Sequence, residues 1–146
     1  MKITTEEDGS TVKFIPHGNG IMILPDGSSW DGEWNNGKAS GEGCFNFSNG
    51  DIYEGFFKDG IRHGDNGTYT YNAHGTEEVK DTYKGQWVNN TKEGIGIQVY
   101  TGVGRYQGYW KEGLRDGEGV MIYENQDVYS GEWKAGKKDG KGTYIF

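Results

Sequence analysis

The chain has 146 residues and a formal net charge of −7, with 32% hydrophobic residues, 14% aromatic residues and 27 glycines. The length is that of one domain, and the acidic balance argues against nucleic acid as a partner, because neutralising phosphates requires clustered basic side chains. The aromatic content argues against a disordered chain, and the scarcity of aliphatic residues argues against a thick core. We therefore expect a thin β structure with rings packed over bare backbone.

Two sequence markers recur along the chain with the same step. The string aromatic-x-Gly-x-aromatic begins at Trp30, Tyr53, Tyr83, Tyr106 and Tyr129, with spacings of 23, 30, 23 and 23 residues. The string Gly-x-Gly follows the same step and breaks it at the same place, where a stretched form occupies 64–67. Two markers with one shared period indicate a structural repeat.

The chain opens with a degenerate copy of this repeat, residues 7–29. It keeps Gly18 and Gly20, but Glu7 and Thr11 hold the two aromatic positions. The loss of both rings suits a unit that caps a repeat array. We interpret the whole chain, residues 1–146, as a single array.

Five further units follow the cap: 30–52, 53–82, 83–105, 106–128 and 129–146. In each unit the aromatic string alternates as a strand, and a turn signal follows two residues after the second ring. These signals are Asn36-Gly37, Asp59-Gly60, Asn89-Asn90, Glu112-Gly113 and Ala135-Gly136. A second strand starts at Gly-x-Gly, where bare glycines leave room for neighbouring rings. The pattern predicts an all-β fold without helix: an elongated single-layer antiparallel meander of repeated β-hairpins.

The unit 53–82 carries an insertion, residues 72–82, in a connection that elsewhere takes few residues. We expect it to project beyond the sheet as a loop. It is either a binding edge or a tolerated loop extension, which costs little free energy.

Two glycine-rich strings imitate nucleotide sites. Residues 131–137 resemble the start of a phosphate-binding loop, but Lys138 stands where a Ser or Thr must hold Mg²⁺, and the string recurs at 32–39. Residues 102–108 resemble a dinucleotide fingerprint, yet they lead into a strand instead of a helix. We expect no nucleotide cofactor.

Other candidates for chemistry are weak. Carboxylate pairs such as Asp31 with Glu33 and Glu54 with Asp59 could imitate a glycosidase dyad, but the residue type at the fourth strand position varies between units, as on a solvated face. The histidines and the single cysteine are scattered and give no zinc spacing: His17, His63, His74 and Cys44. We expect no metal, no cofactor and no catalytic site.

The pattern Tyr-x-Gly-x-Trp-x-x-Gly-Lys-x-x-Gly-x-Gly, repeated every 23 residues, resembles the MORN repeat (membrane occupation and recognition nexus). Residues 129–146, "YSGEWKAGKKDGKGTYIF", match it best, and Phe57 for Trp and Asn90 for Gly depart from it. The resemblance implies hairpins in an elongated sheet with an aromatic-lined groove. It also implies a non-catalytic binding or scaffolding module of the cytoplasm, associated with the cytoskeleton or a membrane junction.

The candidate partner-binding residues are the rings of the aromatic strings: Trp30, Trp34, Tyr53, Phe57, Tyr83, Trp87, Tyr106, Trp110, Tyr129 and Trp133. Either these rings are simply the core, or some remain exposed in a groove, because a single layer cannot bury them all. In the second case we expect the groove to hold an amphipathic helix or an extended segment of another protein.

The C-terminal unit offers two more candidate surfaces. Weak, salt-sensitive association with anionic phospholipid would use its lysines: Lys134, Lys137, Lys138 and Lys141. The strand "GTYIF" would expose Tyr144 and Phe146 at an unpaired edge, which favours a two-fold homodimer if the chain ends there. If the sequence is a fragment of a longer array, another hairpin would cover this edge.

Overall fold

The computed structural model describes residues 2–3, 14–75 and 77–146. Within these residues every regular element is a β-strand, and there is no helix. The part of the cap prediction that concerns residues 7–13 lies outside the described residues. The all-β prediction is confirmed.

Twelve strands form one open sheet. They are β3 (Gly18–Ile23), β4 (Ser29–Asn35), β5 (Lys38–Asn46), β6 (Ile52–Lys58), β7 (Ile61–Arg62), β8 (Gly64–Gly75), β9 (Lys80–Val88), β10 (Thr91–Tyr100), β11 (Gly104–Lys111), β12 (Leu114–Tyr123), β13 (Val128–Lys134) and β14 (Lys137–Ile145). A separate two-stranded sheet pairs β1 (Lys2–Ile3) with β2 (Phe14–Ile15).

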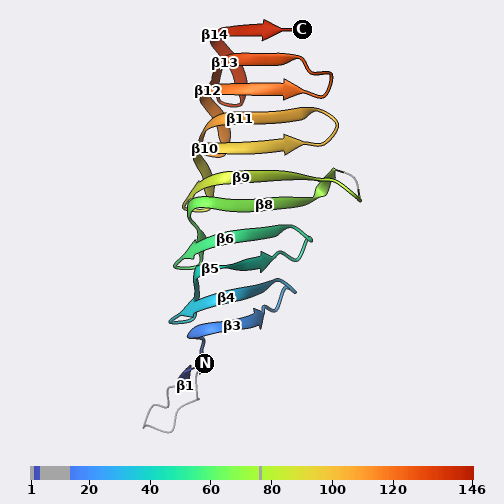
Figure 1. The fold of residues 1–146 in the computed structure, drawn as a ribbon. Helices are drawn as coiled ribbons and strands as arrows, with labels where there is room; N and C mark the ends of the chain where they lie inside the picture. Colours follow the sequence, from blue (N-terminus) through green and yellow to red (C-terminus); the bar gives the residue numbers. More distant parts are fainter. Residues whose placement is uncertain (1, 4–13, 76) are drawn as a thin grey trace.

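The order of strands across the large sheet follows the chain from β3 to β14, and only the short β7 lies off this path, paired with β6. All pairs are antiparallel, and each hairpin lies beside the next in an elongated array (Figure 1). The predicted single-layer meander is therefore confirmed.

The predicted hairpin turns are also confirmed. Both central residues have positive φ at all five sites, for example Asn89 at 48° and Asn90 at 68°. Two consecutive positive φ values define the turn whose twist matches that of the flanking strands. Asn tolerates this conformation better than other residues with a Cβ, which explains why Asn90 can replace glycine.

Successive hairpin tips are joined by one backbone hydrogen bond each. The amide of the second turn residue donates to the carbonyl of a residue that lies two positions after the preceding turn, as from Gly113 N to Lys92 O at 3.1 Å. The same bond joins Gly60 to Ala39, Asn90 to Arg62 and Gly136 to Arg115, and the Gly37 amide donates to the Pro16 carbonyl at 2.9 Å. This bond fixes the register of each tip on its neighbour.

A bulge follows each tip at the first glycine of Gly-x-Gly. Between Lys92 and Gly96 strand β10 has two more residues than β9, and Gly94 has a φ of +66°. The Gln86 side chain accepts a hydrogen bond from the bulged Ile95 amide at 2.6 Å. The fourth strand position is thus not merely a solvated face, as the sequence suggested. In the last unit Glu132 binds the Lys141 amide in the same way.

The insertion is ordered as a continuation of its hairpin. Residues 72–75 belong to β8 and residues 80–82 to β9, with Gly75 opposite Lys80. The β8–β9 hairpin extends farther than its neighbours (Figure 1). Strand pairing joins Gly75 to Lys80 and holds Asp81 and Thr82, whereas the Asn72 amide donates to Asp51 Oδ1 at 2.7 Å, so the described part of the expected loop is partly a continuation of the hairpin.

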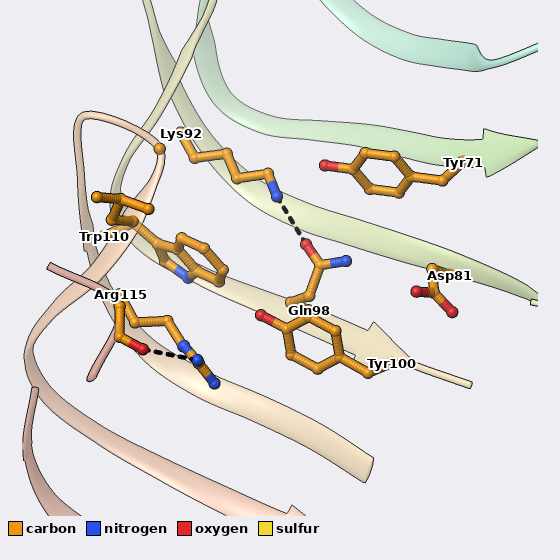
Figure 2. A pocket seen from close by; sticks show the side chains of 10 residues that line it. Tyr71, Asp81, Lys92, Gln98, Tyr100, Trp110 and Arg115 are labelled. Atoms are coloured by element: carbon orange, nitrogen blue, oxygen red, sulfur yellow. Dashed lines mark hydrogen bonds between the residues drawn. The ribbon is translucent and has the colours of Figure 1, made fainter. Parts of the chain in front are cut away.

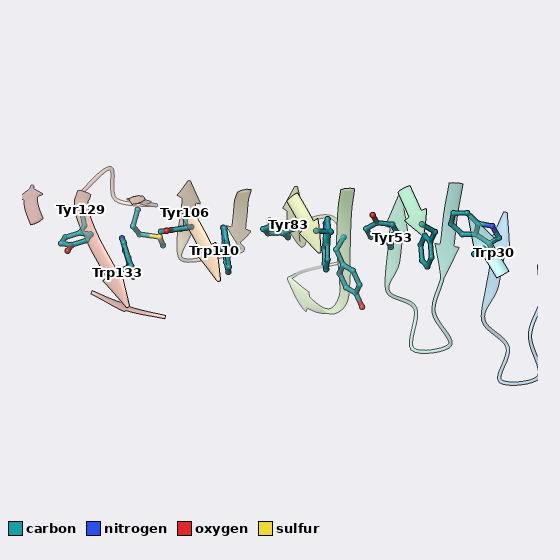
Figure 3. Packing of buried hydrophobic residues seen from close by; sticks show 12 residues of the cluster. Trp30, Tyr53, Tyr83, Tyr106, Trp110, Tyr129 and Trp133 are labelled. Atoms are coloured by element: carbon teal, nitrogen blue, oxygen red, sulfur yellow. The ribbon is translucent and has the colours of Figure 1, made fainter. Parts of the chain in front are cut away.

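The core is a row of buried side chains, mostly aromatic rings, along the sheet (Figure 3), and the tyrosine rings lie against glycines. Tyr83 is fully buried, and a Cβ on Gly85 or Gly96, which face each other across β9 and β10, would collide with its ring. The Tyr83 hydroxyl donates to the Gln86 carbonyl at 2.9 Å. Tyr53, Tyr106 and Tyr129 repeat this arrangement.

Tryptophans connect these tyrosines into a continuous ladder. The ring centroid of Trp110 lies 5.3 Å from those of both Tyr83 and Tyr106, with nearly perpendicular planes. Its Nε1–H donates to the Gly96 carbonyl at 3.2 Å. Edge-to-face contacts of this kind add about 0.5–1.5 kcal/mol each beyond the burial of area. The ladder therefore stabilises each hairpin on the one before it.

The substitution Gly96→Ala is expected to lower the free energy of unfolding by about 1–3 kcal/mol, because its methyl group would overpack the Tyr83 ring. Gly20 holds the corresponding place in the first unit, has no positive φ, and offers a Cβ open space among the described residues. Gly20→Ala is therefore the matched control, with a change within about 0.5 kcal/mol. Urea unfolding of both variants measures the difference, and equal losses would contradict the ring-on-glycine packing.

Candidate binding groove

The candidate partner-binding rings lie mainly inside the protein. Nine of the ten are buried, with Tyr53, Tyr83 and Tyr106 at 0% exposure, and only Trp34 is half-buried. They form a buried layer directly on one face of the sheet, which we call the floor. That these rings contribute to partner binding stays a prediction. Because they are buried, they would contribute by supporting other side chains that contact the partner.

A row of four cations covers this floor: Arg62, Lys92, Arg115 and Lys138. Each is the second residue after a hairpin turn, directly opposite the last ring of the aromatic string, as Lys92 is opposite Trp87. The two preceding units carry Pro16 and Ala39 at this position. The row therefore begins at Arg62 and continues with one cation per repeat.

Each cation lies among three aromatic rings. The Lys92 ammonium is 5.1 Å from the ring centroid of Tyr71, 4.9 Å from that of Tyr83 and 4.8 Å from that of Trp110. The other cations make three such contacts each, at 4.4 to 5.7 Å. Cation–π attraction thus holds the row over the ladder.

The hydrogen bonds of these cations go to neutral oxygens. Lys92 donates to Gln98 Oε1 at 2.8 Å (Figure 2), Arg62 to the Asn90 carbonyl at 3.1 Å, and Arg115 to the Gly136 carbonyl at 2.7 Å. In the part of the chain that the structure describes, none of the four has a carboxylate within ion-pair distance. The row is a line of positive charge without counter-charge.

Burial of these groups changes their acidity. Desolvation and, to a smaller extent, the nearby Arg62 charge lower the pKa of Lys92 to about 8. Desolvation also lowers the pKa of Arg62 and raises the pKa of the Tyr71 hydroxyl to about 12. The floor is thus an environment of low polarity in which charge is poorly solvated.

A second row of rings borders the cations: Phe47, Tyr71, Tyr100 and Tyr123, all half-buried. Between Lys92 and Arg115 lies a hollow of about 490 Å³ that Tyr71 and Tyr100 line (Figure 2). A neighbouring hollow of about 330 Å³ reaches Arg62 and shares Tyr71, Lys92 and Gly113 with the first. The two hollows form a continuous groove, which we call the cation groove.

Carboxylates stand where the connecting turns end, two residues before the first ring of a unit. Asp81 Oδ1 accepts from the Thr101 amide at 2.7 Å, and Asp51 accepts from the Tyr69 hydroxyl at 2.6 Å. Asp127 accepts from the Tyr144 hydroxyl at 3.2 Å. These acidic groups are used within the protein, where they hold the connecting segment at Thr101 and the hydroxyls of Tyr69 and Tyr144.

Comparison with known protein families identifies the family of this repeat. The family described as the MORN repeat matches residues 15–29, 30–52, 53–76, 83–102, 106–128 and 129–146, which is most of the chain. The chain is a MORN-repeat protein. Within this family the array corresponds to six matched repeats, five of which carry the full aromatic string.

The MORN array is similar to parts of longer proteins. Alsin of Mus musculus and of Homo sapiens is 26% identical over 125 residues, covering 62% of this chain and 7% of Alsin. MORN repeat-containing protein 3 of Xenopus laevis is 39% identical over 76 residues, covering 51% of this chain and 32% of that protein. This chain thus spans a small part of the length of these relatives.

The four lysines of the lipid prediction are divided between the two faces. Lys138 stands opposite Trp133 at the exposed end of the cation row, beyond the two hollows, whereas Lys134 and Lys137 pair with each other on the other face. Lys141 is exposed, and its amide binds Glu132. At the outermost strand, β14, Tyr144 is 40% and Phe146 95% exposed.

The strings that imitate nucleotide sites are hairpins in the MORN array. Residues 131–137 span the end of β13, the turn at Ala135-Gly136 and the first residue of β14. Among the described residues no group of three His, Cys, Asp or Glu side chains could hold a metal ion. None of the described segments is a helix long and apolar enough to cross a membrane.

Sequence reasoning missed most of the groove. None of the cations that line it, Arg62, Lys92 and Arg115, was a candidate, and neither were the half-buried rings Tyr71 and Tyr100. The signal was present, because the cations keep the repeat spacing of 30, 23 and 23 residues from Arg62 onward. Comparison of equivalent positions across the repeats would have found a basic column.

Because the pKa of Lys92 is lowered in the folded protein, the free energy of unfolding depends on pH. Between pH about 8 and its ordinary pKa of 10.5, the folded protein has released a proton that the unfolded chain still holds. The free energy of unfolding is therefore expected to rise with pH in this window. Urea unfolding at pH about 7.5 and about 9.5 measures this rise.

Lys92→Met is the control for this effect, since it keeps the apolar stem and removes the titrating group. The wild type should gain more stability than this variant over the same pH interval. Equal changes in both proteins would show that the Lys92 ammonium is solvated.

Proposed function

We propose that this MORN array is a non-catalytic protein-interaction module that binds a segment of a partner protein in the cation groove. The observation that carries the proposal is the continuous groove formed by the two hollows between the cations and the second row of rings. It crosses several hairpins, so one linear segment would contact successive repeats at equivalent positions.

The half-buried tyrosines are the best candidate anchors. Tyr71 and Tyr100 each leave part of a ring accessible while the rest is fixed by neighbours, and both line the larger hollow. Rigid aromatic side chains give large contact area at low cost in conformational entropy, and such residues often dominate binding energy. The buried ladder would act by holding these anchors in place.

The MORN family gives the proposal its cellular context. Repeats of this family mediate protein or membrane association, and relatives such as Alsin contain similar repeats in much longer chains. We infer a scaffolding role in the cytoplasm, at the cytoskeleton or at a membrane junction, with no catalytic step assigned to the array.

Association with anionic phospholipid is the second candidate function. It is favoured by the exposed lysines Lys134, Lys137 and Lys141 near one end of the sheet. Each basic residue contributes at most about 1 kcal/mol at an anionic surface, and the net charge of −7 opposes approach. We therefore rank the peptide-binding function first.

Tyr100→Ala is expected to weaken capture of the native partner by about tenfold or more, because it removes an anchor from the groove. Tyr109→Ala is the matched control, since Tyr109 is 49% exposed on the opposite face of the sheet. Quantitative affinity capture from cell extract compares the two variants with the wild type. Equal retention of every partner by both variants would rule out the groove as the binding site.

We also propose self-association through β14 if the protein ends at Phe146; in a longer array another hairpin would cover this edge. A second copy would pair its strand with this edge and cover Tyr144 and Phe146. Light scattering over a range of concentrations should then give a dimer mass that Tyr144→Lys reduces to that of a monomer. A monomer mass at every concentration would contradict the homodimer.

A further inference from the structure

We propose that the cation groove binds an acidic peptide segment whose carboxylates pair with Arg62, Lys92, Arg115 and Lys138, one carboxylate per repeat. This inference rests on the proposed function and specifies the chemistry of the partner. It predicts the sign of the partner's charge and the spacing of its acidic residues.

The first argument is the unbalanced charge of the groove. The chain has 22 acidic residues against 15 Lys and Arg, yet the groove cations bind only neutral oxygens among the described residues. Placing a cation in a poorly solvated site is unfavourable unless an anion accompanies it. A ligand carboxylate would supply the missing charge and accept charge-assisted hydrogen bonds, which are about twice as strong as neutral ones.

The second argument is that carboxylates of the chain do not take this role. Asp81 lines the same hollow as Lys92 and Arg115, but its Oδ1 is held by the Thr101 amide. Asp51 accepts hydrogen bonds from the Tyr69 hydroxyl and the Asn72 amide. These acids fix turns on one side of the groove, so the cations on the other side remain available to a ligand.

The third argument is the spacing of the row. One repeat contributes two strands at about 4.8 Å each, so adjacent cations are about 10 Å apart. A peptide in the polyproline II conformation advances about 3.1 Å per residue with three residues per turn, so every third side chain lies on the same side and would meet one cation. A helix advances 1.5 Å per residue and would need an acid at about every seventh position. The acidic stretch should match the last four repeats, because Pro16 and Ala39 replace the cation in the first two.

Binding should also take up a proton at Lys92. The charged or titratable groups that face it are Tyr71 on β8, Tyr83 on β9 and Arg62 on β7, and Asp81, Tyr100 and Arg115 border the same hollow. A ligand carboxylate beside Lys92 favours its charged form and raises its pKa from about 8. Affinity should therefore fall by up to about tenfold per pH unit above pH about 8.

The test uses the full chain and fluorescent peptides that each carry four Glu, with binding followed by anisotropy. A peptide of about 13 residues carries Glu at every third position, and a peptide of about 22 residues carries Glu at every seventh. Each has two controls of its own length, one with the same composition in shuffled order and one with Gln in place of Glu. We expect one of the two periodic acidic peptides to bind most tightly, its shuffled control less tightly, and its Gln control at least about tenfold more weakly.

Three variants test the role of Lys92. Lys92→Met should weaken binding of the preferred peptide about tenfold. Lys92→Arg should keep the binding and lose the fall in affinity above pH about 8, since guanidinium stays charged. Lys84→Met removes an exposed charge at a position that alternates away from the groove, and it should leave affinity unchanged.

Several outcomes would overturn the inference: no saturable binding of either periodic acidic peptide at about 1 mM, equal binding of the Gln peptide, or equal effects of Lys92→Met and Lys84→Met. Tighter binding to anionic phosphatidylserine vesicles than to any peptide, lost in Lys92→Met, would assign the row to lipid instead.

Loss of the native partner in Tyr100→Ala but not in Lys92→Met would refute the acidic ligand and keep the groove function. Retention in both variants would refute both proposals.

Discussion

The packing of one aromatic ring on a pair of facing glycines is the contact on which this protein depends. A single-layer sheet has no second layer to bury its side chains, so a ring gains burial only by lying against the backbone. Glycines in adjacent strands permit this, as Gly85 and Gly96 do for Tyr83. The bulge beside them leaves the Gln86 carbonyl to accept the tyrosine hydroxyl, so the buried oxygen is satisfied.

The cation groove follows from the same packing. Because the tyrosine rings lie against the glycines, the next side chains along the hairpin, such as Lys92, extend over them and over the perpendicular tryptophan rings and contribute to their burial. The cation gains attraction from the rings and loses water, and its lowered pKa reflects that balance. The cations that stabilise each repeat are therefore also the groups available to a ligand. The same side chains contribute to folding stability and to the proposed binding.

The fold was predictable from the sequence because its causes are local and repeated. Alternation of rings and polar residues defines strands, turn residues with positive φ define hairpins, and the constant step defines the order of strands. Even Asn90 in place of glycine was interpretable from backbone conformation alone. The insertion was less predictable, since polar residues do not distinguish a loop from a hairpin that continues through a pair such as Gly75 and Lys80.

The sequence by itself determined the class of fold, the array of hairpins and the ladder of rings over glycines, because these depend on residues close together in the chain. Tertiary structure decided which of those rings are accessible. It buried Tyr83 and Tyr106 completely and left Tyr71 and Tyr100 at the surface of the groove. It also set Lys92 against Tyr71 and Trp110 from neighbouring hairpins. Such contacts depend on the register between repeats, so the binding surface emerges only when hairpins stack.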